Sequence, residues 1–120
     1  MKVLVIVDGA PYGTATPAEA FRTMVGLGGM DVDTSAVLVG DGVFVALRGQ
    51  NPKEIDMQDL GKGYETVGEF GVRLYVLKES LEERDIAEED LIKNDGIVDM
   101  KGLRKLIDSA HCVMTFVSGG

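Results

Sequence analysis

Aliphatic runs alternate along the chain with segments in which apolar residues recur every three or four positions. The first run, at residues 2–7, is continuous, which is typical of a strand buried on both faces. Further strands are predicted at 33–39, 72–77 and 112–117, with a very short one at 96–98. Strands that alternate with helices at this spacing indicate an α/β protein: a mostly parallel sheet of four or five strands between helices. The pattern does not fix the strand order.

Helices are predicted between these strands from apolar periodicity and from residues that favour helix starts. Thr16 is a candidate cap for a first helix with Pro17 at its first position, and Gly28-Gly29 ends this helix. Asp41 is a candidate cap for a short helix over 43–48.

The second half of the chain contains further helical segments. A helix is predicted over 60–71, and Ser80 is expected to cap a short helix that ends near 85–86. One helical turn is expected at 88–92, and Asp99 is expected to cap the last helix. The buried stripe of that last helix is predicted to consist of Met100, Leu103, Leu106 and Ile107.

Length and composition indicate a single globular domain. The 120 residues are 45% hydrophobic and 27% charged, which is ordinary for a soluble protein. We expect one domain over 1–117 and a flexible C-terminal tail at 118–120. No apolar run approaches the roughly 18 residues that a membrane helix needs. The first residues lack the features of a secretory signal, so the expected location is the cytoplasm.

Charge and cysteine content exclude several functions. Twenty acidic and twelve basic residues give a net charge of −8, which opposes binding to nucleic acid. Cys112 is the only cysteine, so an internal disulfide or a thiolate metal cluster is excluded. His111 is the only histidine, which argues against a zinc site. We expect neither a cofactor nor a metal.

Three blocks of sequence carry a resemblance to a known family. They read APYGT at 10–14, DGVF at 41–44 followed by LRGQNP at 47–52, and YVLKESLEERDI at 75–86. In this order and spacing they resemble the DsrE/DsrF family of small sulfur-relay proteins, which includes TusC- and TusD-like members. The middle block is most similar to the DsrF/TusC branch. The resemblance extends from Met1 to about Phe116.

The resemblance implies a three-layer α/β/α fold and assembly into trimers or hexamers. It also implies that sulfur-carrying members hold a cysteine in the third block, within the pattern Cys-x-x-(Ser or Cys)-Leu-x-x-Arg-Gly, and pass a persulfide to a partner. This chain keeps Ser80, Leu81 and Arg84 but has Leu77 in place of the cysteine and Asp85 in place of the glycine. Leucine cannot form a persulfide. The chain is therefore similar to the companion subunits, non-catalytic and joined in a homo-oligomer or with a cysteine-bearing DsrE-like subunit.

Sulfur transfer through Cys112 is one alternative. A reactive cysteine needs a lowered pKa and partial exposure. Cys112 lies at the start of the last predicted strand, and free cysteine is among the most buried residue types. We therefore expect Cys112 to be a buried structural residue, with His111 on the opposite face if both lie in the strand.

A small-ligand binding module is the other alternative. The candidate pocket consists of Tyr12, Gly13, Thr14, Asp41, Gly42, Leu77, Ser80 and Arg84. Its first three residues precede a helix start, which can bind phosphate, but they match neither a Walker loop nor a Gly-x-Gly-x-x-Gly fingerprint. Asp8 and Asp41 follow strands and could converge near Leu77 as an acid–base pair, although turns and caps are the commoner use of aspartate.

The third block is also strongly acidic. Arg84 is the one basic residue among seven acidic ones between Glu79 and Asp90. It is expected to form an exposed ion pair or to position a subunit contact. The acidic residues form a solvated face or steer a basic partner.

Overall fold

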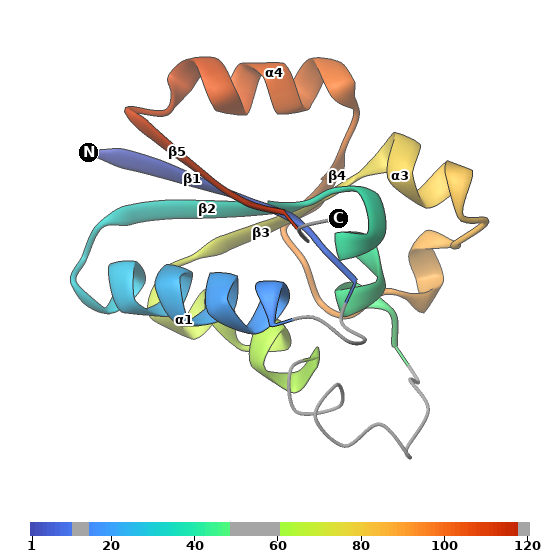
Figure 1. Ribbon diagram of the computed structural model, residues 1–120, viewed down its shortest axis with the longest axis horizontal. Helices are drawn as coiled ribbons and strands as arrows, with labels where there is room; N and C mark the ends of the chain where they lie inside the picture. The colour runs from blue at the N-terminus through green and yellow to red at the C-terminus, as the bar shows by residue number, and fades with distance from the viewer. Residues whose placement is uncertain (11–14, 49–60, 118–120) are drawn as a thin grey trace.

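The computed structural model describes residues 1–10, 15–48 and 61–117 of the chain (Figure 1). It contains five parallel strands in the order β4-β3-β2-β1-β5. The strands are β1 (Lys2–Asp8), β2 (Asp33–Leu38), β3 (Arg73–Leu77), β4 (Gly96–Val98) and β5 (Cys112–Val117). The parallel α/β sheet is confirmed, including the short strand at 96–98, and the structure supplies the strand order.

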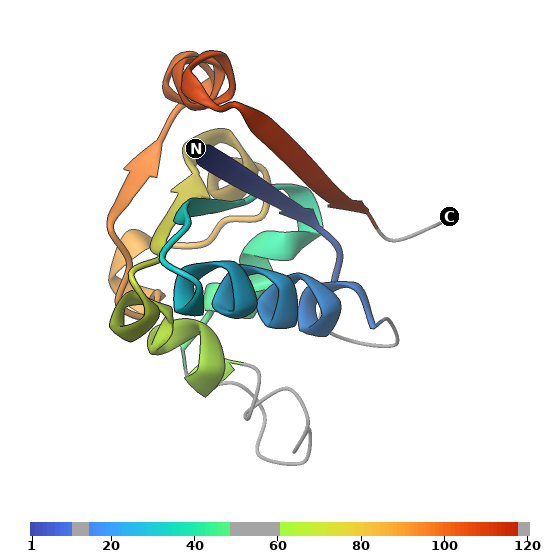
Figure 2. The same ribbon diagram turned by 90° about the vertical axis from the view of Figure 1, so that its left-hand side faces the viewer.

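Two longer helices cover opposite faces of the sheet. Helix α1 (Thr16–Gly29) lies on one face and α4 (Met100–Ser109) on the other (Figures 1 and 2). The shorter elements are α3 (Lys78–Glu83) and the 3₁₀ helices η1 (Gly40–Ala46), η2 (Val67–Phe70) and η3 (Glu88–Asp90). Residues 61–65 form a helical turn directly before η2. This arrangement is the predicted three-layer α/β/α sandwich.

The α1 face of the sheet holds the larger hydrophobic core. Inward residues of β1 such as Val5 and Val7 pack there with Met24 of α1, and all three are fully buried. Tyr64 is also fully buried, and its hydroxyl donates a hydrogen bond of 2.7 Å to the carbonyl oxygen of Pro17. This bond ties the helical segment before η2 to the start of α1.

The α4 face holds a smaller core. Leu4 and Val37 of the sheet pack with Leu103 of α4 and with Leu77 at the end of β3. The predicted stripe of α4 is half wrong, because Met100 is 51% exposed and Ile107 is 39% exposed. They lie on the flank of a helix that meets the sheet through Leu103 and Leu106, so the apolar stripe is narrower than the sequence indicates.

The starts of the helices show which of the predicted capping residues are correct. Asp99 caps α4 as predicted, since its carboxylate accepts a hydrogen bond of 2.7 Å from the Gly102 amide. The caps predicted at Thr16, Asp41 and Ser80 are wrong. Each helix begins at or before its proposed cap, so these side chains lie within the first turn. Two of them bind distant residues instead, as described below.

The remaining predictions concern shorter segments. Of the helix predicted over 60–71, residues 61–65 form a helical turn followed by η2, and residue 60 lies outside the described residues. The turn predicted at 88–92 is η3. The segment predicted as a helix over 43–48 is the 3₁₀ helix η1, which starts at Gly40. Across the described residues, no helix has the length and apolar character that crossing a membrane would require.

Candidate functional site

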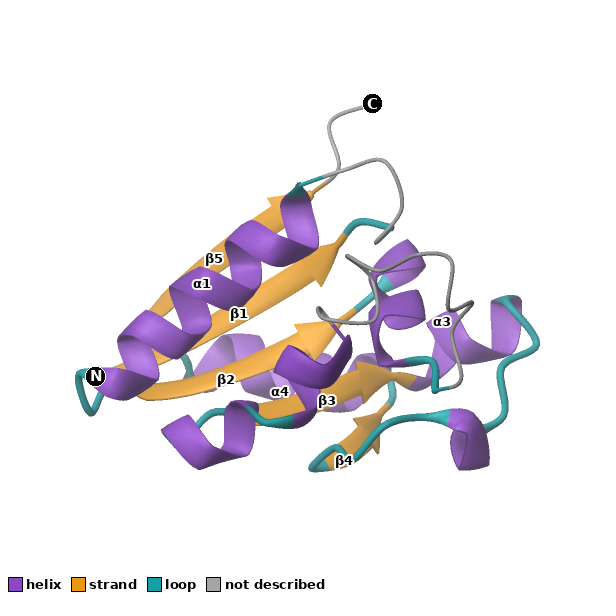
Figure 3. Cartoon of the chain, turned by 90° about the horizontal axis from the view of Figure 1, so that it is seen from below, coloured by secondary structure: helices purple, strands orange, loops and turns teal. Residues whose placement is uncertain are grey.

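The carboxyl end of the sheet, the side on which the parallel strands end, brings η1 and α3 together (Figure 3). Open α/β sheets place ligands at this end. The structure places Asp41, Gly42, Ser80 and Arg84 here, because they belong to the segments that follow β2 and β3. Tyr12, Gly13 and Thr14 lie outside the described residues.

A tight turn follows β2 at Gly40-Asp41-Gly42. Gly40 has φ +53°, and a Cβ atom on it would collide with the carboxylate of Asp8 at the end of β1. A Cβ atom on Gly42 would collide with the carbonyl oxygen of Val7. Glycine is therefore required at both positions, and the turn packs directly onto the end of β1.

Two side chains, one from α3 and one from the residue that caps its C-terminus, fix this turn. The Gly40 amide donates a hydrogen bond of 2.8 Å to the hydroxyl oxygen of Ser80, which is a buried residue. Arg84 approaches Asp41 at 3.0 Å from Nη2 and 3.1 Å from Nε, and its Nη1 donates to the Ser80 carbonyl oxygen at 3.1 Å. The Ser80–Arg84 pair, one helical turn apart, thus joins α3 to η1.

These contacts explain why two predicted caps fail. The Ser80 hydroxyl binds a backbone amide 40 residues away, and the Asp41 carboxylate binds a guanidinium 43 residues away. The expected ion pair of Arg84 is confirmed, but the Arg84 side chain is only 21% exposed while that of Asp41 is 58% exposed. An ion pair with this exposure adds little to the free energy of unfolding. Its main effect is to fix the position of η1 relative to α3.

Leu77 occupies the end of β3, immediately before α3. It is 6% exposed and packs with Leu4, Val37 and Leu103 under α4. The side chain therefore belongs to the α4-face core, whereas the sequence suggested that it would line a ligand pocket. Among the described residues at this end of the sheet there is no thiol, and the Ser80 hydroxyl is buried.

Cys112 lies at the other end of the sheet, and the expected burial is wrong. It is exposed at the start of β5, which is an edge strand, so one side of the strand has no neighbour within the described sheet. The register places Cys112 level with Val3, whereas Leu77 follows Val76, which is level with Leu38 and hence Val7. At about 3.3 Å per residue, Cys112 and Leu77 are separated by roughly 16 Å along the strand direction alone.

His111 does not share the strand with Cys112. It precedes β5, and its Nδ1 accepts a hydrogen bond of 2.9 Å from the Lys2 amide. The His111 amide donates to the Lys2 carbonyl oxygen at 2.8 Å. His111 therefore extends the pairing of β1 with β5 by one residue.

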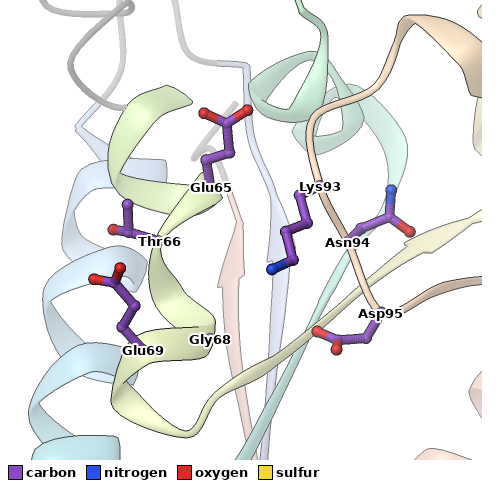
Figure 4. A pocket seen from close by; sticks show the side chains of 7 residues that line it. All are labelled: Glu65, Thr66, Gly68, Glu69, Lys93, Asn94 and Asp95. Carbon is purple, nitrogen blue, oxygen red and sulfur yellow. The ribbon is translucent and has the colours of Figure 1, made fainter.

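The structure also shows a polar pocket that the sequence did not indicate. It has a volume of about 410 Å³ and lies between the segment 65–69 and the segment 93–95 (Figure 4). Lys93 points into it, with Glu65 and Glu69 on the opposite wall. The carboxylate of Asp95 accepts a hydrogen bond of 2.7 Å from the Leu74 amide. Within 1–10, 15–48 and 61–117, no three His, Cys, Asp or Glu side chains are placed to hold a metal ion.

Comparison with known proteins extends these observations. Residues 1–116 match the model of the DsrE/DsrF-like family. The chain is 36% identical over 85 residues to the "Intracellular sulfur oxidation protein DsrF" of Allochromatium vinosum. That alignment covers 70% of this chain and 62% of the relative, so less than two thirds of the relative's length is matched.

Other relatives match over nearly their whole length. A "Protein TusC homolog" of Pseudomonas aeruginosa is 31% identical, with 94% of this chain and 96% of the relative covered. The crystal structure of the ychN protein from E. coli has a TM-score of 0.78 and 28% sequence identity. This match covers 97% of this chain and 100% of that chain.

The fold and its carboxyl end define a small α/β/α domain with a five-stranded parallel sheet. The chain belongs to the DsrE/DsrF-like family.

Proposed function

We propose that this chain is a subunit of a sulfur-relay assembly that does not itself carry sulfur. In this role it forms the oligomer and presents a docking surface, while a cysteine-bearing DsrE-like subunit holds the persulfide. Membership of the family and the names of its DsrF and TusC relatives support the pathway.

The single observation that carries the proposal is Leu77. The resemblance puts the sulfur-carrying cysteine of active members at this position. Here the side chain is a leucine, 6% exposed and packed into the α4-face core, so it offers neither a thiol nor access. The neighbouring Ser80–Arg84 contacts hold the surrounding backbone in place.

Exposed apolar side chains support the oligomer part of the proposal. Val113 and Val117 of β5 are 40% and 57% exposed, and Met100 and Ile107 of α4 are also exposed. Four of the seven exposed large hydrophobic residues in the described part of the chain thus lie on β5 and α4. Exposed apolar residues that share an edge strand and a neighbouring helix are typical of surfaces covered in an assembly. The assembly is a homo-oligomer or a hetero-oligomer with the cysteine-bearing relative.

The test combines the purified chain with the cysteine-bearing DsrE-like protein of the same organism. Native mass spectra are recorded for each protein and for the mixture, before and after a polysulfide donor. We expect a mixed or homomeric oligomer in which only the relative gains sulfur. If this chain neither self-associates nor joins the relative, the docking role is wrong.

A sulfurtransferase using Cys112 is a second candidate, because Cys112 is exposed. The same spectra decide it when Cys112→Ser is run in parallel. A stable gain of one sulfur atom per chain that disappears in Cys112→Ser would make this chain the carrier. No gain in the wild-type chain would reject this candidate.

A further inference from the structure

Helix α3 has two differently used sides. Ser80 and Arg84 face η1 and hold it, as described above. The other side faces η3 across an open groove with a volume of about 300 Å³. We call it the α3–η3 groove. The Ser80–Arg84 contacts make one wall of this groove rigid, although they take no part in lining it.

The groove has an apolar floor and an acidic rim. Leu81, Ile86 and Ala87 form the apolar part, with Leu81 buried at 2% exposure and Ile86 half-buried. Glu82, Glu88 and Glu89 are exposed lining residues. None of these three carboxylates has an ion pair within the described part of the chain.

The local charge is not neutralised by the nearby basic residues. Arg84 is already paired with Asp41 and Glu83. Lys78 also lines the groove, so its lining carries three acidic side chains and one basic one. A phosphate backbone or an anionic membrane would be repelled here. The complementary occupant is a helix or segment that carries basic side chains beside exposed apolar ones.

Helix α4 of this same chain carries that combination. Met100, Arg104 and Ile107 follow one another at i, i+4 and i+7, which places them in one stripe along the helix. All three are exposed, and Leu103 and Leu106 face the sheet instead. Lys101 and Lys105 are exposed on the outer side of α4, with Asp108 as its acidic residue.

We propose that the α3–η3 groove receives the Met100–Arg104–Ile107 stripe of α4 from a second copy of this chain. Arg104 and Lys101 meet the rim carboxylates, and an apolar end of the stripe contacts the floor. Amphipathic helices bind apolar grooves through anchors at this spacing. This inference rests on the oligomer part of the proposed function and assigns the surfaces that make the contact.

The position of the two surfaces within one chain favours a paired contact. The Met100 amide donates a hydrogen bond of 3.1 Å to Oε2 of Glu79, so the start of α4 lies beside α3. A twofold axis near this point would bring two identical groove–helix contacts together, as an isologous interface requires. Doubling the contact brings the buried area closer to what a stable dimer needs.

The test reverses the charges first on the groove and then on the α4 stripe, by substitution. Glu88→Lys with Glu89→Lys changes the groove, and Lys101→Glu with Arg104→Glu changes the stripe. Each double variant should weaken self-association at least about tenfold, because like charges then face each other. The chain with all four changes should recover most of the lost association, since both signs are exchanged. Analytical ultracentrifugation measures the dissociation constants.

Two controls separate the contact from general effects. Glu65→Lys with Glu69→Lys makes the same change of charge in the pocket of Figure 4, away from the groove, and should leave association unchanged. Ala87→Trp fills the groove without altering charge and should weaken association. Circular dichroism melts verify that every variant is folded.

The outcomes are distinct. A monomeric wild-type chain would contradict both this inference and the homo-oligomer part of the proposed function. An oligomer that survives both double variants would contradict the inference alone. Weakening without recovery in the four-residue variant would also overturn it, because the two surfaces would then not meet.

Discussion

The two faces of the sheet differ in how completely they are covered. On the α1 face, inward strand residues such as Val5 and Leu74 pack against α1, Tyr64 and the 3₁₀ helices, and are almost fully buried. On the α4 face, a single ten-residue helix packs on the middle of the sheet. Beyond it, Val113 and Val117 of β5 are exposed on the same side as Leu4 and Asp8, their partners in the register.

This difference indicates that the two faces have different tasks. The α1 face holds the main hydrophobic core of the fold, because the inward side chains of β1, β2 and β3 are all buried there. The α4 face keeps apolar and basic groups at the surface, as a docking surface would. Leu77 lies on this second face, so its burial depends on α4.

The largest expected effect comes from replacing one buried leucine on each face of the sheet by alanine. Leu74→Ala should lower the free energy of unfolding by about 4 kcal/mol, and Leu103→Ala by about 2 kcal/mol, because the second cavity can relax toward solvent. Urea unfolding at one fixed protein concentration measures both values. Equal losses would show that the α4 face is as tightly packed as the α1 face.

The buried tyrosine provides a test that depends on pH. Burial raises the pKa of the Tyr64 hydroxyl above its ordinary value. In the unfolded chain the Tyr64 hydroxyl ionises at about pH 10, whereas in the folded chain it stays neutral at that pH. Its contribution to the free energy of unfolding is therefore fully present below about pH 10 and is lost as the pH rises further. Tyr64→Phe should remove this alkaline decline. It should also cost about 1 kcal/mol at neutral pH, because the Pro17 carbonyl loses its donor.

Tyr75→Phe is the matched control for this measurement. Tyr75 lies half-buried on the α4 face, and the variant retains Tyr64. Urea unfolding between pH 7 and 11 should therefore show the same alkaline decline as the wild-type chain. A decline that persists in Tyr64→Phe would assign it to another group.

The cap of α4 is expected to have a smaller effect, confined to the α4 face. Asp99→Ala removes the acceptor of the Gly102 amide and should cost about 1 kcal/mol. Asp99→Asn keeps an acceptor and should cost less. Hydrogen exchange of the α4 amides measures the local change. If exchange increases equally in α1, the two faces are not independent.

The sequence predicted the strands well because short aliphatic runs between turn and helix signals are typical of the strands of a parallel sheet. It could not give the strand order, because the pattern of one strand does not identify its neighbour. That gap explains the mistaken burial of Cys112. A cysteine at the start of a central strand would be covered, whereas β5 is an edge.

Contacts between residues that are far apart in the sequence also limited the prediction of the candidate site. The family resemblance and the rule that sites lie at strand ends were enough to bring Asp41, Ser80 and Arg84 to one place. Their partners were not predictable, since Ser80 and Asp41 bind groups 40 and 43 residues away instead of capping their own helices. The Asp99 cap was predictable because its partner is three residues away.

The smallest expected effect concerns Asp85, which lies where the family pattern has glycine. Asp85 follows the end of α3 with φ +55°, a conformation that costs an L-residue energy and that glycine adopts freely. Asp85→Gly should therefore raise the free energy of unfolding by about 0.5 to 1 kcal/mol. Asp85→Ala removes the same carboxylate but keeps a Cβ atom. If the alanine variant is stabilised as much as the glycine variant, the gain comes from relieving repulsion among the acidic residues of 79–90. If only glycine stabilises, the backbone conformation at the end of α3 is the cause, and the carboxylate of Asp85 carries no measurable cost to folding.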